Sequence, residues 1–205
     1  MFKQMGFAVL GCTFVLGALV IYERKKTERI NDKRNGAYWA REAHANTVRR
    51  KDITFLPYLS IPLDRLPMEP SEDEEVREYQ DTIKVLSGLR VINLSDMTNT
   101  DLKEEYGVAN LPQLSEYDEN YTTLVNTLTR WGARLIALEQ YDDAVTVLEY
   151  GISIGSDVTR NYLLLAQEYR RRGEVEKIDA LIEQAEGLTT LMKDSLLAKL
   201  KVLRD

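Results

Sequence analysis

Apolar residues recur at helical spacing through the carboxyl-terminal half of the chain. Leu128, Trp131 and Leu135 lie three or four positions apart, and Tyr162, Leu165 and Tyr169 repeat that spacing. Such spacing puts the residues on one side of an α-helix, because a helix completes a turn about every 3.6 residues. The pattern predicts amphipathic helices that pack through apolar stripes, and so an all-α fold class.

The same residue classes return after 34 positions, without an insertion. A first unit at 125–158 aligns with a second at 159–187, and small residues at Gly132 and Ala166 would let a second helix approach closely. The pattern therefore predicts two antiparallel helix hairpins, with a plain antiparallel bundle as the alternative. The aligned pairs are Leu128/Tyr162, Trp131/Leu165, Gly132/Ala166, Leu135/Tyr169, Ala144/Ile178, Leu148/Ile182 and Gly151/Ala185.

This recurrence resembles the tetratricopeptide repeat, which shares its period and its order of large and small residues. Two departures are Ser156 and Thr190 where the family has proline, and Ile178 where it has a small residue. The resemblance implies a concave groove, lined by the first helix of each unit, that receives a peptide or a helix of a protein partner. The implied groove residues are Asn126, Thr129, Ala133 and Ile136 in the first unit, and Arg160, Leu163, Gln167 and Arg170 in the second.

Two units seldom cover their own apolar faces, so flanking segments are expected to complete the stack. On one side, residues 71–124 are expected to form a helical region that docks on the first unit. On the other, residues 188–205 are predicted to form a terminal capping helix. Its apolar stripe comprises Leu188, Leu191, Met192, Leu196, Leu200 and Leu203.

The region before the repeats has a mixed pattern. Ser71 with Glu74 predicts a capped helix that ends at Gly88, and residues 98–107 predict a short helix that ends at Gly107. Residues 38–51 favour a helix, and RVINLS (90–95) is strand-like without a partner strand. The proline-rich stretch 55–70 is expected to be extended and, because it is rich in apolar residues, to lie against the helical body.

The amino-terminal part contains a charge-free run, Met5–Tyr22. Its 18 residues would span roughly 27 Å as a helix, close to the thickness of the hydrocarbon core of a bilayer. Residues 1–22 are therefore predicted to be a single-pass transmembrane anchor. A cleaved signal peptide would need a small-residue exit where LVIYERKK stands, and a lipoprotein anchor on Cys12 would need the run to end there.

Charge is distributed unevenly behind this run. Residues 23–51 hold ten basic and four acidic residues, a net charge of +6, whereas residues 52–205 hold 16 basic and 29 acidic residues, a net charge of −13. Segment 23–70 is thus expected to be a basic juxtamembrane and proline-rich connection. Its basic residues predict a cytoplasmic domain, and they would also attract anionic lipids.

The sequence contains no catalytic or phosphate-binding motif. It lacks a glycine-rich phosphate loop, Gly-x-Ser-x-Gly and His-Glu-x-x-His, and its single histidine and single cysteine, His44 and Cys12, cannot form a His/Cys metal cluster. No cofactor or metal is therefore expected. Nucleic-acid binding is not expected either, because the strongly basic stretch adjoins the predicted anchor.

These features together favour a non-enzymatic, membrane-tethered scaffold or adaptor that binds a protein or peptide partner at the cytoplasmic surface of a cell membrane. Arg160 and Arg170 would suit an acidic partner segment, although RRRG (170–173) could instead be a solvated helix end. One alternative is an envelope-assembly or translocation accessory factor, or an organelle import receptor; protease accessibility in intact cells would distinguish its topology. A second alternative is an enzyme whose chemistry lies in residues 35–110.

Overall fold

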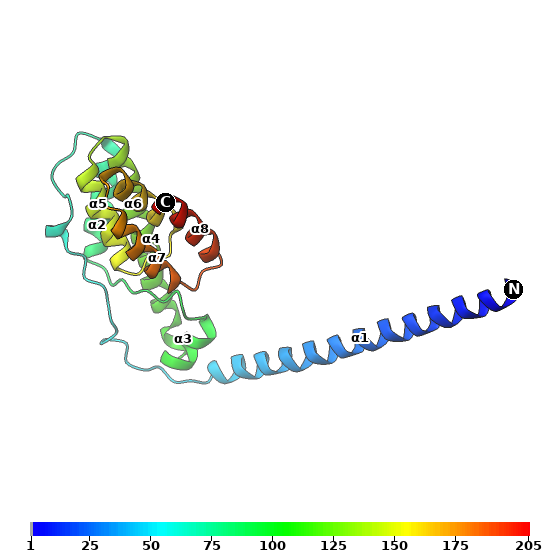
Figure 1. Cartoon of the computed structure of the whole chain (residues 1–205). Coiled ribbons are helices and arrows are strands. Elements are labelled where there is room, and N and C mark those ends of the chain that lie inside the picture. Colours follow the sequence, from blue (N-terminus) through cyan, green and yellow to red (C-terminus); the bar gives the residue numbers. More distant parts are fainter. Residues whose placement is uncertain (1) are drawn as a thin grey trace. The chain divides into compact units, whose positions relative to one another are not determined.

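In the computed structural model of the protein, the backbone is described for residues 2–205, and the side chains for the same range without residues 2–19, 21, 28 and 30. These residues form eight α-helices and two short 3-10 helices, η1 and η2, with no β-strand among them, which confirms the predicted all-α class (Figure 1). They divide into two compact units. The first comprises Met1–Lys51 and Asn99–Ala109, and the second comprises Asp52–Thr98 and Asn110–Asp205.

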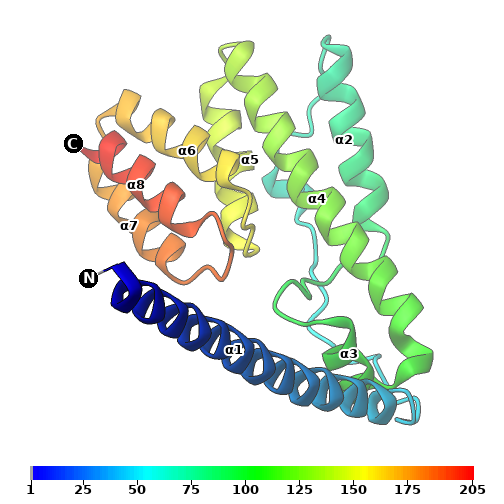
Figure 2. The ribbon, with the colours of Figure 1, turned by 90° about the vertical axis from the view of Figure 1, so that its right-hand side faces the viewer.

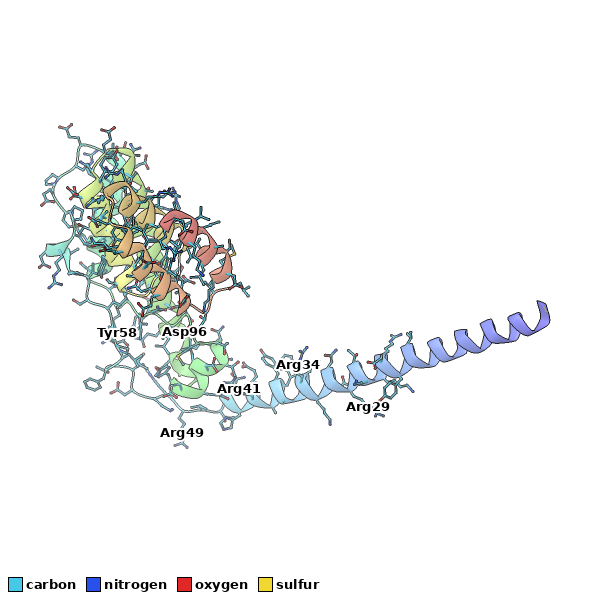
Figure 3. The ribbon with its side chains drawn as sticks, in the orientation of Figure 1. Arg29, Arg34, Arg41, Arg49, Tyr58 and Asp96 are labelled. Carbon is cyan, nitrogen blue, oxygen red and sulfur yellow. The ribbon has the colours of Figure 1, made fainter. Side chains whose placement is uncertain are left out.

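The first unit consists of the long helix α1 (Phe2–Ala45) with the short helix α3 (Asn99–Tyr106) beside its carboxyl-terminal end (Figure 1). Arg41, labelled in Figure 3, lies near the carboxyl-terminal end of α1. Its guanidinium pairs with Asp101 of α3 at 2.5 Å and with Glu104 of α3 at 2.6 Å. Glu42 pairs with Lys103, and this contact lowers the pKa of the Glu42 carboxyl. Opposite charges on the two helices thus join them.

The predicted helix 38–51 is confirmed only as far as Ala45, where α1 ends. The predicted helix 98–107 is confirmed as α3, which is followed by η2 (Val108–Asn110). Gly107 ends α3 with a φ of +87°, a backbone conformation that glycine adopts without strain. A side chain at this position would also collide with the backbone of Arg49.

The predicted anchor Met5–Tyr22 lies, apart from Val20 and Tyr22, outside the residues with described side chains. Among the described residues, no helix combines the length and the apolarity that crossing a bilayer requires.

The second unit contains the other helices, packed in chain order. Helix α2 lies against α4, α4 against α5, α5 against α6 and α6 against α7, while α8 contacts both α6 and α7 (Figure 2). The elements are η1 (Leu63–Arg65), α2 (Glu74–Ser87), α4 (Leu111–Ala137), α5 (Tyr141–Ser153), α6 (Thr159–Arg172), α7 (Val175–Glu186) and α8 (Lys193–Arg204).

Equivalent helices begin 34 residues apart. Helix α5 begins at Tyr141 and α7 at Val175, while α6 begins at Thr159 and α8 at Lys193. The paired positions from the sequence are all buried, with Trp131, Leu148, Ala166 and Ile178 exposed by 1% or less. The two predicted hairpins are therefore present as α4–α5 and α6–α7, with buried residues where the periodicity placed them.

Gly132 provides the close approach between α4 and α5. A Cβ atom at this position would lie 2.6 Å from Cγ and Cδ2 of Leu148, which is itself fully buried. Contacts between carbon atoms are favourable near 3.5–4.0 Å, so any larger residue here would displace the side chain of Leu148.

The flanking segments differ from the prediction in three respects. Helix α4 is continuous over 27 residues, so the expected boundary at residue 125 falls inside it. Residues 99–109 of the segment expected to dock on the repeats belong to the first unit. The capping helix begins only at Lys193, which leaves Leu191 outside it and fully exposed, whereas Leu196 and Leu200 are buried as expected.

Residues 55–70 form an irregular connection with turns, bends and η1, so the predicted extended path is present only in part. Ile61 and Leu66 are buried in a core shared with α2, α4 and α5. Phe55 is an exception to the expected packing, because it is 91% exposed. The strand-like residues 90–95 do not form a strand. Their backbone groups bond elsewhere: the N–H of Leu94 donates to the Asp118 carboxylate at 2.9 Å, and the Asn120 amide donates to the Arg90 carbonyl at 3.0 Å.

Asp73 caps α2, two residues after the predicted Ser71. Its carboxylate accepts a hydrogen bond from the N–H of Val76 at 3.1 Å and pairs with Arg134 of α4 at 2.6 Å. The bond from Arg134, followed by that from Val76, lowers the pKa of Asp73. The prediction of Ser71 as the capping residue is wrong. Asp73 is favoured because it also pairs with Arg134 of α4, a contact that a local sequence pattern cannot reveal.

The two hairpin turns share a left-handed residue at equivalent positions. Glu139, before α5, has a φ of +61°, and Gly173, 34 positions later and before α7, has a φ of +73°. Glycine adopts this conformation readily, whereas other L-residues do so at a cost of roughly 1–2 kcal/mol. The first turn is therefore strained and the second is not.

Exchanging the residue types should have opposite effects on stability. We expect Glu139→Gly to raise the free energy of unfolding by up to about 1 kcal/mol, since relief of strain exceeds the entropy that glycine adds to the unfolded chain. Gly173→Glu should lower it by about 1–2 kcal/mol through the backbone, because no atom lies within 4 Å of a Cβ at this position. Urea unfolding of both variants measures the two changes, and changes of the same sign would contradict this explanation.

Candidate partner-binding groove

An open cleft of about 400 Å³ lies between α6 and α8. Leu163 and Gln167 line it from α6, and Ala198, Lys199, Val202 and Leu203 line it from α8. Most of these side chains are apolar, and Val202 is 71% exposed at the surface. Helix α8 can form this wall because Leu196 and Leu200 on its other side are buried with α6 and α7, which orients the remaining face toward the cleft.

Cationic side chains accompany the apolar lining. Arg160 and Arg170 lie on the same stripe of α6 as Leu163 and Gln167, at a spacing of three or four residues, and Lys199 lies on α8. The Arg170 guanidinium donates to the Val202 carbonyl at 3.3 Å, which connects the two walls. Among the described residues, Arg160 and Lys199 have no ion pair or side-chain hydrogen bond, and no acidic side chain lines the cleft. The cleft is therefore mostly apolar, with the cation Lys199 in its lining and two arginines on the same stripe of α6.

The groove positions implied for the first unit do not line this cleft. Asn126 is exposed and its amide donates to the Thr122 carbonyl of its own helix at 2.9 Å. Thr129 is buried, with its hydroxyl bonded to the Val125 carbonyl at 2.8 Å, so it cannot contact a partner at the surface, contrary to the prediction. Ala133 and Ile136 are partly buried, and Ile136 packs against the core shared by α2, α4 and α5 and against a second core formed by α5, α6, α7 and α8.

The sequence prediction missed the α8 wall. Residues 188–205 were expected to act as a cap, and their outward side was not considered as part of a groove. A usable signal was present, because Lys193 follows Thr159 by 34 residues and Leu196 falls at the position of Leu128 and Tyr162. Helix α8 thus occupies the place of the first helix of a third unit.

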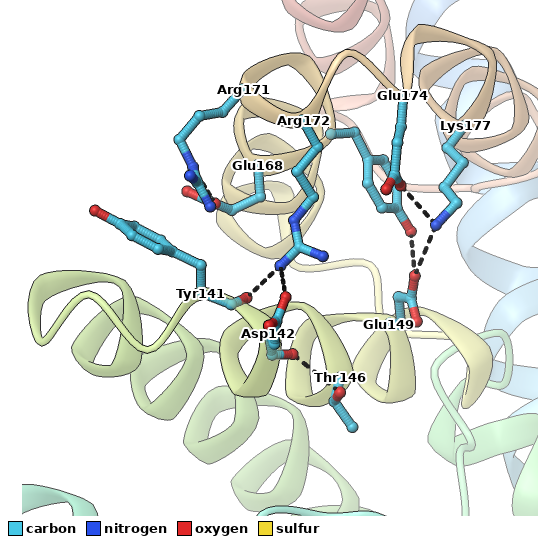
Figure 4. A network of polar contacts seen from close by, with 10 residues as sticks. Tyr141, Asp142, Thr146, Glu149, Glu168, Arg171, Arg172, Glu174 and Lys177 are labelled. Carbon is cyan, nitrogen blue, oxygen red and sulfur yellow. Dashed lines mark hydrogen bonds and ion pairs between the residues drawn. The ribbon is translucent and has the colours of Figure 1, made fainter.

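A second hollow, of about 590 Å³, lies where the end of α6 meets the start of α5. It is polar and its cations are engaged. Arg172 donates to the Tyr141 carbonyl at 2.9 Å and pairs with Asp142 at 2.7 Å (Figure 4). Arg171 pairs with Glu168 at 2.8 Å and lies 3.7 Å above the centre of the Tyr141 ring. These two arginines of RRRG therefore join the hairpins, whereas Arg170 points to α8.

Further contacts in the same network connect α5, α6 and α7. The Tyr169 hydroxyl of α6 donates to Glu149 of α5 at 2.7 Å, and Lys177 of α7 pairs with Glu149 at 3.9 Å (Figure 4). The Lys177 ammonium also lies 4.9 Å from the centre of the Tyr169 ring. Burial, reinforced by Glu149, raises the pKa of the Tyr169 hydroxyl, so it stays protonated and acts as a donor. The network joins the two hairpins, in contrast to Arg160 and Lys199, which have no ion pair within the part of the chain that the structure describes.

A third hollow, of about 450 Å³, lies between the proline-rich segment and the turn before α5. Its lining is acidic and includes Glu69, Asp73 and Asp143. Burial and the neighbouring Glu69 raise the pKa of Asp143. Among the described residues, no group of three or more histidine, cysteine or acidic side chains is arranged to hold a metal ion.

The geometry thus selects the α6–α8 cleft as the candidate site. Comparison of the chain with protein-family models, with curated proteins and with solved structures finds no match in any of the three.

Proposed function

We propose that the chain is a non-enzymatic scaffold or adaptor, tethered to the cytoplasmic face of a cell membrane, whose tetratricopeptide-like array binds a protein or peptide partner. The observation that carries this proposal is the α6–α8 cleft, which combines a mostly apolar lining with Lys199. Neither Lys199 nor Arg160, which lies on the same stripe of α6 as Leu163, has an ion pair among the described residues. Grooves of this kind accept an amphipathic segment by burying its apolar side chains.

The array supports the proposal through its arrangement. Helices α6 and α8 begin 34 residues apart and stand side by side, as first helices of successive units do in the resembled family. Their adjacent faces line one continuous cleft. Residues of both α5 and α6 enter the same core, so the groove is held on a packed support rather than on loops.

The tether is supported by the sequence and by the surface of α1. The charge-free run Met5–Tyr22 precedes exposed basic residues, of which Lys25, Lys26, Arg29 and Lys33 recur on one side of the helix (Figure 3 labels Arg29). Basic residues on the cytoplasmic flank set orientation and attract anionic lipid headgroups. Such a tether would confine the groove to the membrane surface and raise its effective concentration for partners there.

Val202→Asp tests the groove as a partner site. Val202 is exposed, so an aspartate there should leave the fold intact while it places a charge among the apolar contacts of the cleft. We expect affinity isolation of the full chain from detergent-solubilised membranes to recover the wild-type partner at a level lower by about tenfold or more with this variant. Quantitative mass spectrometry measures the recovery.

The matched control is Val85→Asp on α2, where valine is 65% exposed and outside the cleft. It should recover the wild-type partners in full. Partner lists and amounts that are the same for wild type, Val202→Asp and Val85→Asp would overturn the proposed role of the groove.

A further inference from the structure

The charge of the cleft differs in sign from that of the domain that carries it. Residues 52–205 have a net charge of −13, yet the polar residues that line the cleft are Lys199 and the neutral Gln167. Arg160 and Arg170 lie on the same stripe of α6 as the lining residues Leu163 and Gln167. A partner segment with carboxylates is therefore repelled by most of the domain and attracted at this face. Complementary charge of this kind determines specificity and the rate of association.

On this basis, and resting on the proposed function, we infer that the α6–α8 cleft binds an acidic amphipathic segment of a protein partner. Its apolar side chains would enter between Leu163, Val202 and Leu203, and its carboxylates would pair with Arg160 and Lys199. A guanidinium can bind a carboxylate through two parallel hydrogen bonds, which gives Arg160 directional selectivity.

The spacing of the cations favours a peptide over a single anionic headgroup. Arg160 and Arg170 lie at opposite ends of the α6 stripe, ten residues or about 15 Å apart along the helix. One headgroup cannot reach both ends, whereas carboxylates distributed along a helical or extended segment can. This arrangement matches a partner segment that carries apolar residues on one face, to contact the cleft, and acidic residues on the other, to pair with the cations.

Charge also disfavours a second copy of α8 as the occupant. Helix α8 presents Lys199 beside the exposed Val202 and carries Lys201 as well, while its acidic residue Asp194 lies in the first turn. Arg204 is already paired with Asp179 and Asp205. Pairing two such faces would bring lysine side chains of like charge together beside the apolar contact. Like charges that meet at an interface destabilise it.

Synthetic peptides test the inference on the full chain in lipid nanodiscs. The first probe is a fluorescent peptide of about 16 residues with leucines at helical spacing on one face and glutamates on the other. The second has lysine in place of each glutamate, and the third has the composition of the first with its leucines scattered. We expect the first probe to bind at least about tenfold more tightly than either of the others, as measured by fluorescence anisotropy.

Charge-reversal variants identify the residues responsible. Arg160→Glu with Lys199→Glu should weaken binding of the glutamate probe by about tenfold or more and strengthen that of the lysine probe. Lys201→Glu is the matched control, because it makes the same charge change at an exposed position of α8 that does not line the cleft. It should change the affinity for the glutamate probe and for the lysine probe by no more than about twofold, because a charge outside the cleft is screened from the bound peptide by salt.

Several outcomes would overturn the inference. The first is equal binding of the glutamate and lysine probes, and the second is failure of all three probes to bind at concentrations up to about 1 mM. The third is displacement of the glutamate probe by oleate, which would indicate a lipid site. If the probes do not distinguish charge while Val202→Asp still loses its membrane partner, the acidic preference is wrong and the proposed function stands. If Val202→Asp keeps every partner, the proposed function itself fails.

Discussion

Trp131→Ala is expected to lower the free energy of unfolding by about 3–5 kcal/mol, the range for removing a fully buried large aromatic side chain. Trp131 is completely buried in the core that α2, α4 and α5 share. Its indole nitrogen has no hydrogen-bond partner among the described residues, so the loss arises from packing and not from a broken polar contact. Urea unfolding followed by circular dichroism measures this change.

The chain contains a matched control, because its other tryptophan is exposed. Trp39 on α1 is 66% exposed, and its ring contacts Tyr38 edge to face. Trp39→Ala should therefore change the free energy of unfolding by no more than about 0.5 kcal/mol. This variant also leaves Trp131 as the single tryptophan, whose fluorescence then reports unfolding of the core. Similar losses from both alanine variants would contradict the packing assigned to Trp131.

Trp131→Phe covers the case in which the alanine variant does not fold. Phenylalanine keeps an aromatic ring in the site and leaves a smaller cavity than alanine does. The free energy of unfolding of this variant should therefore lie between that of wild type and that of the alanine variant. A phenylalanine variant as unstable as the alanine variant would show that the position depends on more than filled volume.

The second large effect is expected at Gly132, where Gly132→Val should cost about 2–3 kcal/mol because of overpacking. A Cβ alone would lie 2.6 Å from two carbon atoms of Leu148, and the two methyl groups of valine add to the crowding. Leu148 is fully buried, so it can move away from a new side chain only by displacing other core residues. Urea unfolding gives the loss directly.

A double-mutant cycle attributes this loss to one contact. In a Leu148→Ala background, Gly132→Val should lower the free energy of unfolding by less than it does in the wild-type background. The difference between the two losses, which is the coupling energy, should be at least about 1 kcal/mol. Gly36→Val on α1 is the control for introducing valine into a helix, because no atom lies within 4 Å of its Cβ position. An additive cycle would show that α4 and α5 do not approach each other at this glycine.

Periodicity predicted the packing of the repeats well because it reports burial directly. Trp131, Gly132, Ala144 and Leu148 occupy buried positions of one hairpin, and their counterparts 34 residues later are buried too. Helix ends were predicted less well. Asp73 caps α2 instead of Ser71, since the choice between nearby capping residues depended on Arg134, which is distant in the sequence.

Half of the candidate site followed from the resemblance to a repeat family. Leu163 and Gln167 line the cleft as implied, whereas Thr129, at an equivalent position in the first unit, is buried. The position of a residue within a repeat indicates on which side of its helix the residue lies. It does not indicate whether another part of the chain covers that side. For the same reason, the α8 wall with Lys199 and Val202 was not expected.

The sequence by itself determined the helical class, the 34-residue recurrence and the residues that form the repeat core, because each depends on spacing along one helix. The tertiary structure decided where α2 is capped, why residues 90–95 do not form a strand and which face of α6 remains open. These outcomes depend on which elements distant in the sequence supply hydrogen bonds and cover apolar surface. Local patterns cannot specify such contacts, because the partners are selected only when the helices pack.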